Sequence, residues 1–453
     1  MSRLSDFWGR LSPRRRLVYL LVALALVTTH AAPGSWNAAS RIATVQSLVE
    51  YHTFVIDNTA FIGTGDKVFI DDHFYSDKPP IPSVLGAAVY WPLYQGGIGL
   101  HLGSSTAYYL VTLLTVRLFW LLGTLAFFSA LAYTGLDIEK RYLATVALGL
   151  GSLYFSWSST YNSHSLAASF LCIGFYYFLR ARFGPAVNLN LGAAAFFLSL
   201  AGTADVPTGL FYVLFLLYVL RDPRLRAGMT FYLLPLLATL IPALAITYSI
   251  HHSIVPVQIV AAYFQYPGSP WVGSNELSGM HANSVAFTFG YALSALVGPK
   301  GFLLYDPIIA IALWGLVRAI RDKGRFFYEA IVVATGCAAV ALYYLLATNN
   351  YGGWSYSIRW FVPLLPLLFF FLYPFFETYS PKRAGAFRVL LCVAIVIAFV
   401  GAIDPWSHRD LSEVPFIANL EEIPYGVRAL RNVAAPAPPA ACKTCAGDTT
   451  LRR

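Results

Sequence analysis

The residues best suited to chemistry lie in one short window, residues 66–80, with the sequence DKVFIDDHFYSDKPP. Two consecutive prolines, Pro79 and Pro80, exclude a regular helix for the residues before them, because each proline fixes its own φ and restricts its predecessor. We therefore expect Asp77 and Lys78 to lie in an extended segment that leads into a helix beginning near Ser83. The alternative is an ordinary solvated loop between two membrane spans.

These residue types match one kind of reaction. A carboxylate can activate a hydroxyl group as a general base, which makes Asp66, Asp72 and Asp77 the candidate catalytic residues. A lysine or arginine can hold a phosphate leaving group, which makes Lys78 the candidate phosphate ligand. The combination suits transfer from a phosphate-activated donor whose lipid tail lies in a membrane. The sequence has no glycine-rich phosphate loop and no convincing metal-ligand spacing, so we expect neither a cofactor nor a metal.

The composition indicates a membrane protein. Of the 453 residues, 57% are hydrophobic and 12% are charged, whereas soluble domains contain about 25% charged residues. Several apolar windows reach the roughly 20 residues that cross a bilayer as a helix. The net charge of +9 is spread over short loops, as orientation in a membrane requires, so we do not expect a nucleic-acid partner.

Alternation of the apolar segments gives a consistent topology. With a cytosolic N-terminus and about eleven transmembrane helices, the loops dense in lysine and arginine all fall on the cytosolic side. The first apolar segment also resembles a signal peptide, but we expect it to be retained as an anchor. Residues 285–300 are expected to form a hairpin or re-entrant piece. The expected all-α polytopic protein has a cytosolic N-terminus (1–16), a transmembrane domain (17–403) with a long first extracytoplasmic loop (33–103) that carries amphipathic helices and the site motif, and an extracytoplasmic C-terminal tail (404–453).

Three stretches resemble a known class of enzymes. The first loop reads NAASRIATVQSLVEYHTFVID over 37–57 and DKVFIDDHFYSDKPPIPSVLGAAVYWPLY over 66–94. Two later stretches read GPKGFLLYDPIIAIALWGL over 298–316 and NNYGGWSYSIRWFVPLLPLL over 349–368. In this order they resemble GT-C-type integral-membrane glycosyltransferases, in particular bacterial family-39-like enzymes related to protein O-mannosyltransferases and the aminoarabinose transferases of lipid A.

The resemblance implies an inverting transfer from a polyprenyl-phosphate-linked sugar to an extracytoplasmic acceptor, which can be a glycan, a lipid or a protein. It implies that Lys78 contacts the donor phosphate, that Asp77 occupies the acidic position before it, and that Arg359 adds a second positive contact. Many members place a catalytic acid where this chain has Asn37, which cannot act as a base at neutral pH. Asp66, Asp72 or Asp77 is then expected to take that role.

Three further residues are candidate substrate contacts on the same face. Arg41 lies on the helix of the first loop, Tyr75 in the aromatic run before Lys78, and His164 at the end of a predicted span. Each also has a structural interpretation: Arg41 can hold the loop together, Tyr75 can belong to an aromatic interface belt, and His164 can cap a helix.

Two other functions fit parts of the sequence. A transporter or flippase of a lipid-linked or amphipathic substrate would use charges at membrane depth, and Arg117 is the main charge of that kind. A non-catalytic scaffold with a vestigial donor pocket would account for Asn37. The enzyme hypothesis places the protein in membrane lipids, in the bacterial cytoplasmic (inner) membrane, with its site on the extracytoplasmic face of the cell envelope.

Overall fold

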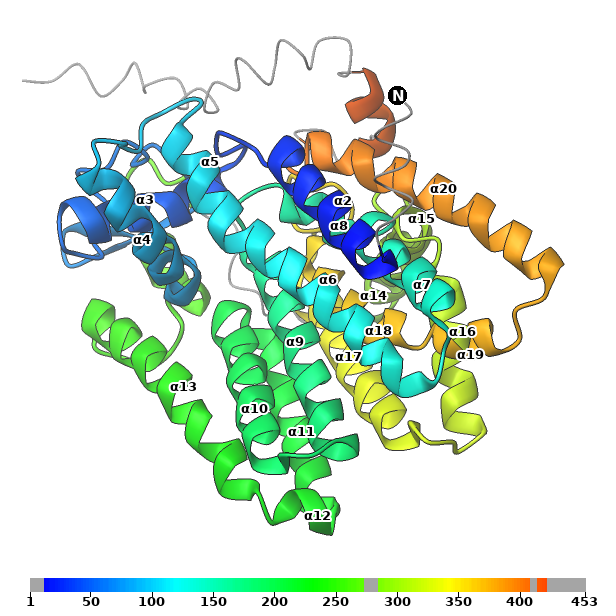
Figure 1. Cartoon of the computed structure of the whole chain (residues 1–453). Coiled ribbons are helices and arrows are strands. Elements are labelled where there is room, and N and C mark those ends of the chain that lie inside the picture. Colours follow the sequence, from blue (N-terminus) through cyan, green and yellow to red (C-terminus); the bar gives the residue numbers. More distant parts are fainter. Residues whose placement is uncertain (1–11, 273–283, 408–413, 422–453) are drawn as a thin grey trace, which may run out of the picture.

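A computed structural model describes residues 12–272, 284–407 and 414–421 (Figure 1). Nearly all regular structure in these ranges is helical. In chain order the main elements are α2 (Pro13–Thr28), α3 (Trp36–Glu50), β1 (Lys67–Ile70), β2 (His73–Ser76), α4 (Pro80–Gln95), α5 (Thr106–Thr112), α6 (Leu118–Ala130), α7 (Ile138–Leu150), α8 (Leu153–Ser158), α9 (Ser163–Phe183), α10 (Val187–Ala204), α11 (Gly209–Arg221), α12 (Pro223–Arg226), α13 (Met229–His251), α14 (Val285–Val297), α15 (Phe302–Tyr305), α16 (Ile309–Arg321), α17 (Phe327–Ala347), α18 (Leu365–Phe370), α19 (Tyr373–Glu377) and α20 (Pro381–Ile403). Short 3₁₀ or π segments are η1 (Leu113–Arg117), η2 (Leu131–Thr134), η3 (Val206–Thr208), η4 (Val257–Ile259), η5 (Ala261–Phe264) and η6 (Arg359–Leu364).

The chain is a polytopic α-helical membrane protein, as the sequence predicts. Within the described ranges, eight helical stretches are long and apolar enough to cross a bilayer. They are Thr106–Thr134, Ser163–Phe183, Val187–Ala204, Met229–His251, Val285–Tyr305, Phe327–Ala347, Arg359–Glu377 and Pro381–Ile403.

Other apolar segments form short or interrupted helices. The first apolar segment, expected to be an anchor, contains the 16-residue helix α2. Helices α7 and α8 are separated around Gly151. Helices α15 and α16 are separated by a segment that contains Asp306 and Pro307. The piece predicted to be re-entrant at 285–300 is instead mostly the helix α14, which forms part of a candidate span with α15.

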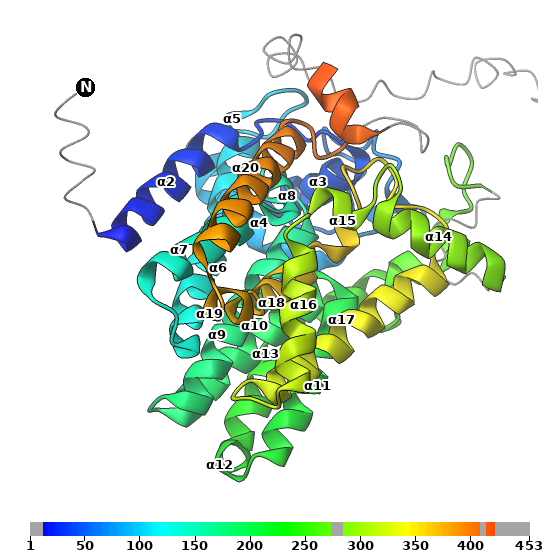
Figure 2. The ribbon, with the colours of Figure 1, turned by 90° about the vertical axis from the view of Figure 1, so that its right-hand side faces the viewer.

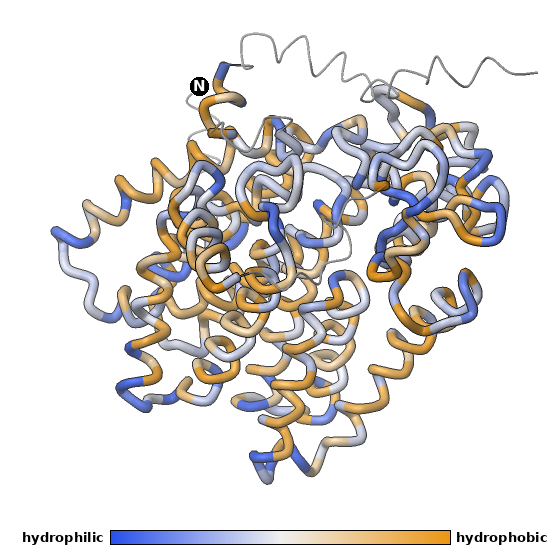
Figure 3. The backbone as a smooth tube through the Cα atoms, turned by 180° about the vertical axis from the view of Figure 1, so that it is seen from behind, coloured by the Kyte–Doolittle hydropathy of each residue, from blue (hydrophilic) through white to orange (hydrophobic). Residues whose placement is uncertain are grey.

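The helices form a bundle with a polar layer at one end. Helices α9, α10 and α11 run side by side, whereas α3 and α4 lie together above the bundle (Figure 1). The short helix α12 lies at the opposite end of the bundle. After a quarter turn, α14 and α17 are seen to extend to one side (Figure 2). Apolar residues dominate the middle of the bundle and hydrophilic residues gather toward its ends (Figure 3).

The first loop is held together by close packing of α4 on α3. Ser35 caps α3, because its Oγ accepts a hydrogen bond from the Ala38 amide at 3.2 Å. A Cβ atom at Gly86 of α4 would lie 2.8 Å from Val45 of α3 and would also overlap the Tyr161 hydroxyl. The absence of a side chain at Gly86 therefore allows the two helices to approach each other.

A two-stranded hairpin connects these helices. Strands β1 and β2 are antiparallel, and Lys67 pairs with Ser76 at the open end. Asp71 and Asp72 form the two-residue turn with φ values of 49° and 65°, the left-handed conformation that such hairpins need at both turn positions. Asp66 directly precedes β1 and Asp77 directly follows β2. Because Lys67 pairs with Ser76, the two aspartates lie opposite each other.

We expect Gly86→Ala to destabilise the protein by about 1–3 kcal/mol, because the added methyl group overpacks the contact between α3 and α4. Gly63→Ala is the matched control, since a Cβ at Gly63 meets no atom within 4 Å. The thermal unfolding temperature of the detergent-solubilised variants measures the difference. Equal temperatures for the two variants would contradict this account of Gly86.

Candidate functional site

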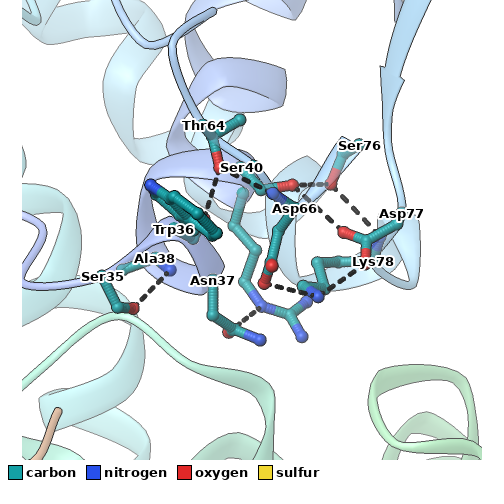
Figure 4. A network of polar contacts seen from close by, with 12 residues as sticks. Ser35, Trp36, Asn37, Ala38, Ser40, Thr64, Asp66, Ser76, Asp77 and Lys78 are labelled. Atoms are coloured by element: carbon teal, nitrogen blue, oxygen red, sulfur yellow. Dashed lines mark hydrogen bonds and ion pairs between the residues drawn. The ribbon is translucent and has the colours of Figure 1, made fainter. Parts of the chain in front are cut away.

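An ammonium group held by two carboxylates lies at the base of the hairpin. Lys78 Nζ is 2.7 Å from Asp66 Oδ2 and 2.7 Å from Asp77 Oδ2 (Figure 4). The side chains of Lys78 and Asp66 are each 13% exposed, and that of Asp77 is 2% exposed. The contact is therefore largely withdrawn from water, where an ion pair is strong and the loss of one partner is costly.

Local sequence explains why Lys78 reaches this position. Pro80 is the first residue of α4, three positions earlier than the predicted start near Ser83, because proline suits the first turn of a helix. The chain before it is extended, as predicted. The Lys78 amide donates to Ser76 Oγ at 3.2 Å, and that hydroxyl lies 2.6 Å from Ser40 Oγ of α3. The hairpin and α3 thus fix the backbone on which Lys78 stands.

Burial governs the protonation of Asp77. It raises the pKa of Asp77 above the ordinary value of 3.8, while the Lys78 ammonium offsets part of this rise. The guanidinium of Arg41 acts in the same direction as Lys78. The ionised form of Asp77 is thus favoured by its cationic neighbours and disfavoured by its removal from water.

Arg41 connects the first loop to the helix bundle. Its Nη2 donates to Ser163 Oγ at 2.8 Å, and its Nε donates to Asn37 Oδ1 at 3.4 Å. Its Nη1 is buried and has no hydrogen-bond partner among the described residues. Burial lowers the pKa of Arg41 to about 10, so the group remains a cation at neutral pH. A buried cationic donor without a partner is suited to an anionic ligand.

Arg359 approaches from the opposite end of the chain. It follows a turn in which Gly352 and Gly353 have φ values of 94° and 68°, a conformation that glycine adopts readily. The Arg359 guanidinium lies 5.0 Å from the centre of the Trp406 ring. Its Nε is also buried without a hydrogen-bond partner in the described part of the chain.

A histidine and an aspartate form a third group. His164 Nδ1 is 2.7 Å from Asp205 Oδ2, and both residues are buried. Asn162 caps α9 by accepting from the Ser165 amide at 2.9 Å, which places His164 in the first turn of that helix. Asp205 follows the last residue of α10. The contact therefore joins the ends of two neighbouring helices.

These groups line one cavity of about 550 Å³. Of the residues predicted from sequence, Asp77, Lys78, Arg41, Arg359 and His164 line it. Asn37 does so as well. The other lining residues are Pro79, Ser163, Ala204, Asp205, Val206, Pro207, Leu210, Pro256, Gln258, Ile259, Ala339, Val340, Tyr343, Tyr344, Thr348 and Trp360. The cavity thus brings together cations from α3, from the segment before α4 and from η6.

Three predicted residues are not among those that line the cavity. Asp66 contributes through its ion pair with Lys78. Asp72 is exposed at the hairpin turn, where the two-residue connection directs it away from the base of the hairpin. Tyr75 pairs with Val68 across the hairpin and packs on a separate small apolar cluster that includes Val257.

Sequence reasoning did not identify Asp205 or Ser163 as site residues. A signal was present, because a buried histidine at a span end needs a polar partner and Asp205 is an acid at a neighbouring span end. Pairing Ser163 with Arg41 required knowledge of how the first loop folds onto α9.

We expect Lys78→Met to lower stability by about 3–5 kcal/mol, because two facing carboxylates lose their shared cation. Repulsion then raises the pKa of one carboxyl group in the folded state. A raised folded-state pKa favours folding at low pH and ceases to do so as the pH rises through that pKa. The loss of stability in Lys78→Met relative to the wild type should therefore be larger at about pH 8 than at about pH 5.

Lys67→Met is the matched control for this prediction, because Lys67 Nζ donates to the carbonyl oxygen of Ile62 and forms no carboxylate pair. Unfolding temperatures at the two pH values report the difference between the variants. A deficit of Lys78→Met that does not change with pH would contradict the shared-cation description.

No protein-family model matches the chain, and no curated protein matches it in sequence. Among solved structures, ArnT from Cupriavidus metallidurans bound to undecaprenyl phosphate is similar with a TM-score of 0.56 and 15% identity, covering 91% of this chain and 69% of that chain. The apo state of the same protein gives 0.55 and 14%, covering 91% and 68%. The apo oligosaccharyltransferase of Archaeoglobus fulgidus gives 0.51 and 11%, covering 91% and 56%. The predicted architecture is confirmed: this chain has the GT-C-type fold of membrane glycosyltransferases.

Proposed function

We propose that the protein is a membrane glycosyltransferase that moves a sugar from a polyprenyl-phosphate donor to an extracytoplasmic glycan, lipid or protein, with inversion at the anomeric carbon. The observation that carries the proposal is the cavity into which Lys78, Arg41 and Arg359 converge. The fold that surrounds the cavity supports the same proposal, because a solved ArnT that holds undecaprenyl phosphate has a similar fold.

The three cations have complementary roles in this proposal. Arg41 Nη1 and Arg359 Nε are buried donors without partners among the described residues, so a phosphate oxygen would satisfy both. Lys78 supplies a compact charge whose position is fixed by Asp66 and Asp77. Negative charge grows on the departing phosphate during transfer, and fixed cations stabilise that charge more in the transition state than in the ground state.

The wall of the cavity suits an amphipathic donor. Leu210 of α11, with Ala339 and Val340 of α17, gives apolar surface. The charged groups come from the first loop, from η6 and, with Asp205, from the end of α10. A lipid phosphate with an attached sugar presents the same division between an apolar tail and a polar head. Aromatic side chains such as Tyr344 and Trp360 are present for contact with a sugar face.

The acceptor hydroxyl needs a base. Of the three acids expected to serve, Asp77 alone is among the residues that line the cavity, and Asp66 contributes through Lys78. Asn37 also lines the cavity but has no basic lone pair.

The alternative of a transporter or flippase relied on Arg117, and the surroundings of that residue favour a structural role. Arg117 donates to Ser158 Oγ at 2.6 Å and to the backbone carbonyl of Thr28 at 3.2 Å. Its guanidinium lies 5.1 Å and 5.0 Å from the centres of the Trp120 and Phe155 rings. It is not among the residues that line the cavity.

The orientation proposed for the molecule places the cavity outside the cytosol, in a bacterial inner membrane. The basic helix α12 lies at the end of the bundle opposite α3 and α4 (Figure 1). Arginines concentrated at that end would face the cytosol under the positive-inside rule. The donor would then enter from the outer leaflet.

We expect Arg359→Met to weaken binding of undecaprenyl phosphate by about tenfold or more, which corresponds to about 1.4 kcal/mol. Arg359 Nε has no hydrogen-bond partner in the described part of the chain, so the substitution leaves no buried acceptor unsatisfied. Quenching of tryptophan fluorescence on titration with undecaprenyl phosphate measures the affinity.

Arg221→Met is the matched control, because Arg221 is exposed and hydrogen-bonds to Tyr328 away from the cavity. Lys78→Ala should abolish sugar transfer while folded protein remains in the membrane. Unchanged affinity in Arg359→Met together with full transfer by Lys78→Ala would refute the proposed phosphate site.

A further inference from the structure

We infer that the imidazole of His164, held by Asp205, is the general base that deprotonates the acceptor hydroxyl. This inference rests on the proposed function and assigns one role within it. The geometry behind it is the short contact between His164 Nδ1 and Asp205 Oδ2 at the edge of the cavity that contains the phosphate-binding cations.

The contact with Asp205 determines which ring nitrogen is available. A carboxylate can only accept a hydrogen bond, so Nδ1 carries the proton and Nε2 keeps its lone pair. Nε2 has no hydrogen-bond partner among the described residues. It is also not fully buried. It is therefore open to the cavity that His164 lines. A fixed imidazole with a free lone pair is the arrangement that general-base catalysis requires.

The position of His164 relative to Asn37 supports the assignment. Arg41 donates hydrogen bonds to Asn37 and to Ser163, the residue before His164. The Asn37 amide and the His164 imidazole line the same cavity. In this assignment, the base absent at Asn37 is supplied from the start of α9.

The carboxylates of the hairpin are less suitable as the base. Asp66 and Asp77 each form an ion pair with Lys78 at 2.7 Å. Protonation of Asp77 during transfer would weaken its hold on the ammonium when charge is growing on the phosphate. When His164 accepts the proton, Asp77 stays ionised and continues to position the Lys78 ammonium.

Sugar transfer exchanges one bond at the anomeric carbon and moves one proton. The acceptor O–H gives its proton to the Nε2 lone pair, and the oxygen forms a bond to the anomeric carbon of the sugar. The bond between that carbon and the phosphate oxygen breaks, and its electron pair leaves with the phosphate. The products are the glycosylated acceptor, polyprenyl phosphate and an imidazolium paired with Asp205. The imidazolium then releases its proton to water.

The rate should fall with decreasing pH as His164 becomes protonated, since the imidazolium has no lone pair. Charged and titratable groups around it come from several elements. They are Asp205 after α10, Arg41 on α3, Arg359 in η6, Asp77 and Lys78 before α4, and Tyr343 and Tyr344 on α17.

His164→Asn is the variant that separates the two roles of the side chain. The asparagine amide can replace Nδ1–H as a donor to Asp205, but it has no counterpart of Nε2. We expect a loss in kcat of about 100-fold or more, disappearance of the acidic limb of the pH–rate profile, and affinity for undecaprenyl phosphate within about twofold of the wild type. Radiolabelled synthetic undecaprenyl-phosphate hexoses and pentoses serve as donors, with isolated membranes as the acceptor.

Asp77→Asn is the comparison variant, because it removes the competing carboxylate. It should weaken donor binding while leaving the acidic limb in place. His164→Gln provides a second test of the histidine should His164→Asn fail to fold. Wild-type rates and profile in a folded histidine variant, or loss of the acidic limb in Asp77→Asn, would overturn the assignment of the base. Absence of both donor binding and transfer in the wild type would instead overturn the proposed function.

Discussion

The arrangement of the first loop depends on one ammonium group shared by two carboxylates. Lys78 lies between Asp66 and Asp77, which the hairpin register places opposite each other. Taking these charges out of water is costly, and the mutual attraction together with added hydrogen bonds has to offset that cost. The hydroxyls of Ser40 and Ser76 supply such bonds around Asp77. The outcome is a cation fixed at the edge of the cavity.

Hydrogen bonds between distant segments complete the cavity. Arg41 on α3 bonds to Ser163 at the start of α9, and the Trp406 indole donates to Thr160 Oγ1 at 3.0 Å. Trp406 in turn lies under the guanidinium of Arg359. The early, middle and late parts of the chain therefore meet at one place, and each contributes charged or polar groups.

Much of the architecture follows from the sequence. Long apolar segments separated by basic loops indicate a polytopic membrane protein, and the three stretches that resemble GT-C-type enzymes imply a GT-C-type fold, which the structure confirms. The window around Lys78 stands out in the sequence because two prolines and clustered charges are local signals, and its role stays a prediction. What sequence did not reveal was non-local: that Asp66 and Asp77 face each other, that Asp72 lies at an exposed turn, and that Asp205 holds His164. Hairpin register and helix-end contacts depend on packing between segments, which a linear pattern does not encode.

The hairpin also limits how the loop can vary in length. Ten residues, 67–76, separate the two acids, and they divide into two four-residue strands and a two-residue turn. Adding one residue to each strand lengthens the ribbon and leaves its base unchanged, whereas one residue added to a single strand creates a bulge or slips the pairing. With the two-residue turn retained, the acids therefore stay opposite each other only when the strands change by an even number of residues in total. Residues can therefore be added or removed in pairs near the turn without displacing the ion pairs of Lys78 with Asp66 and Asp77.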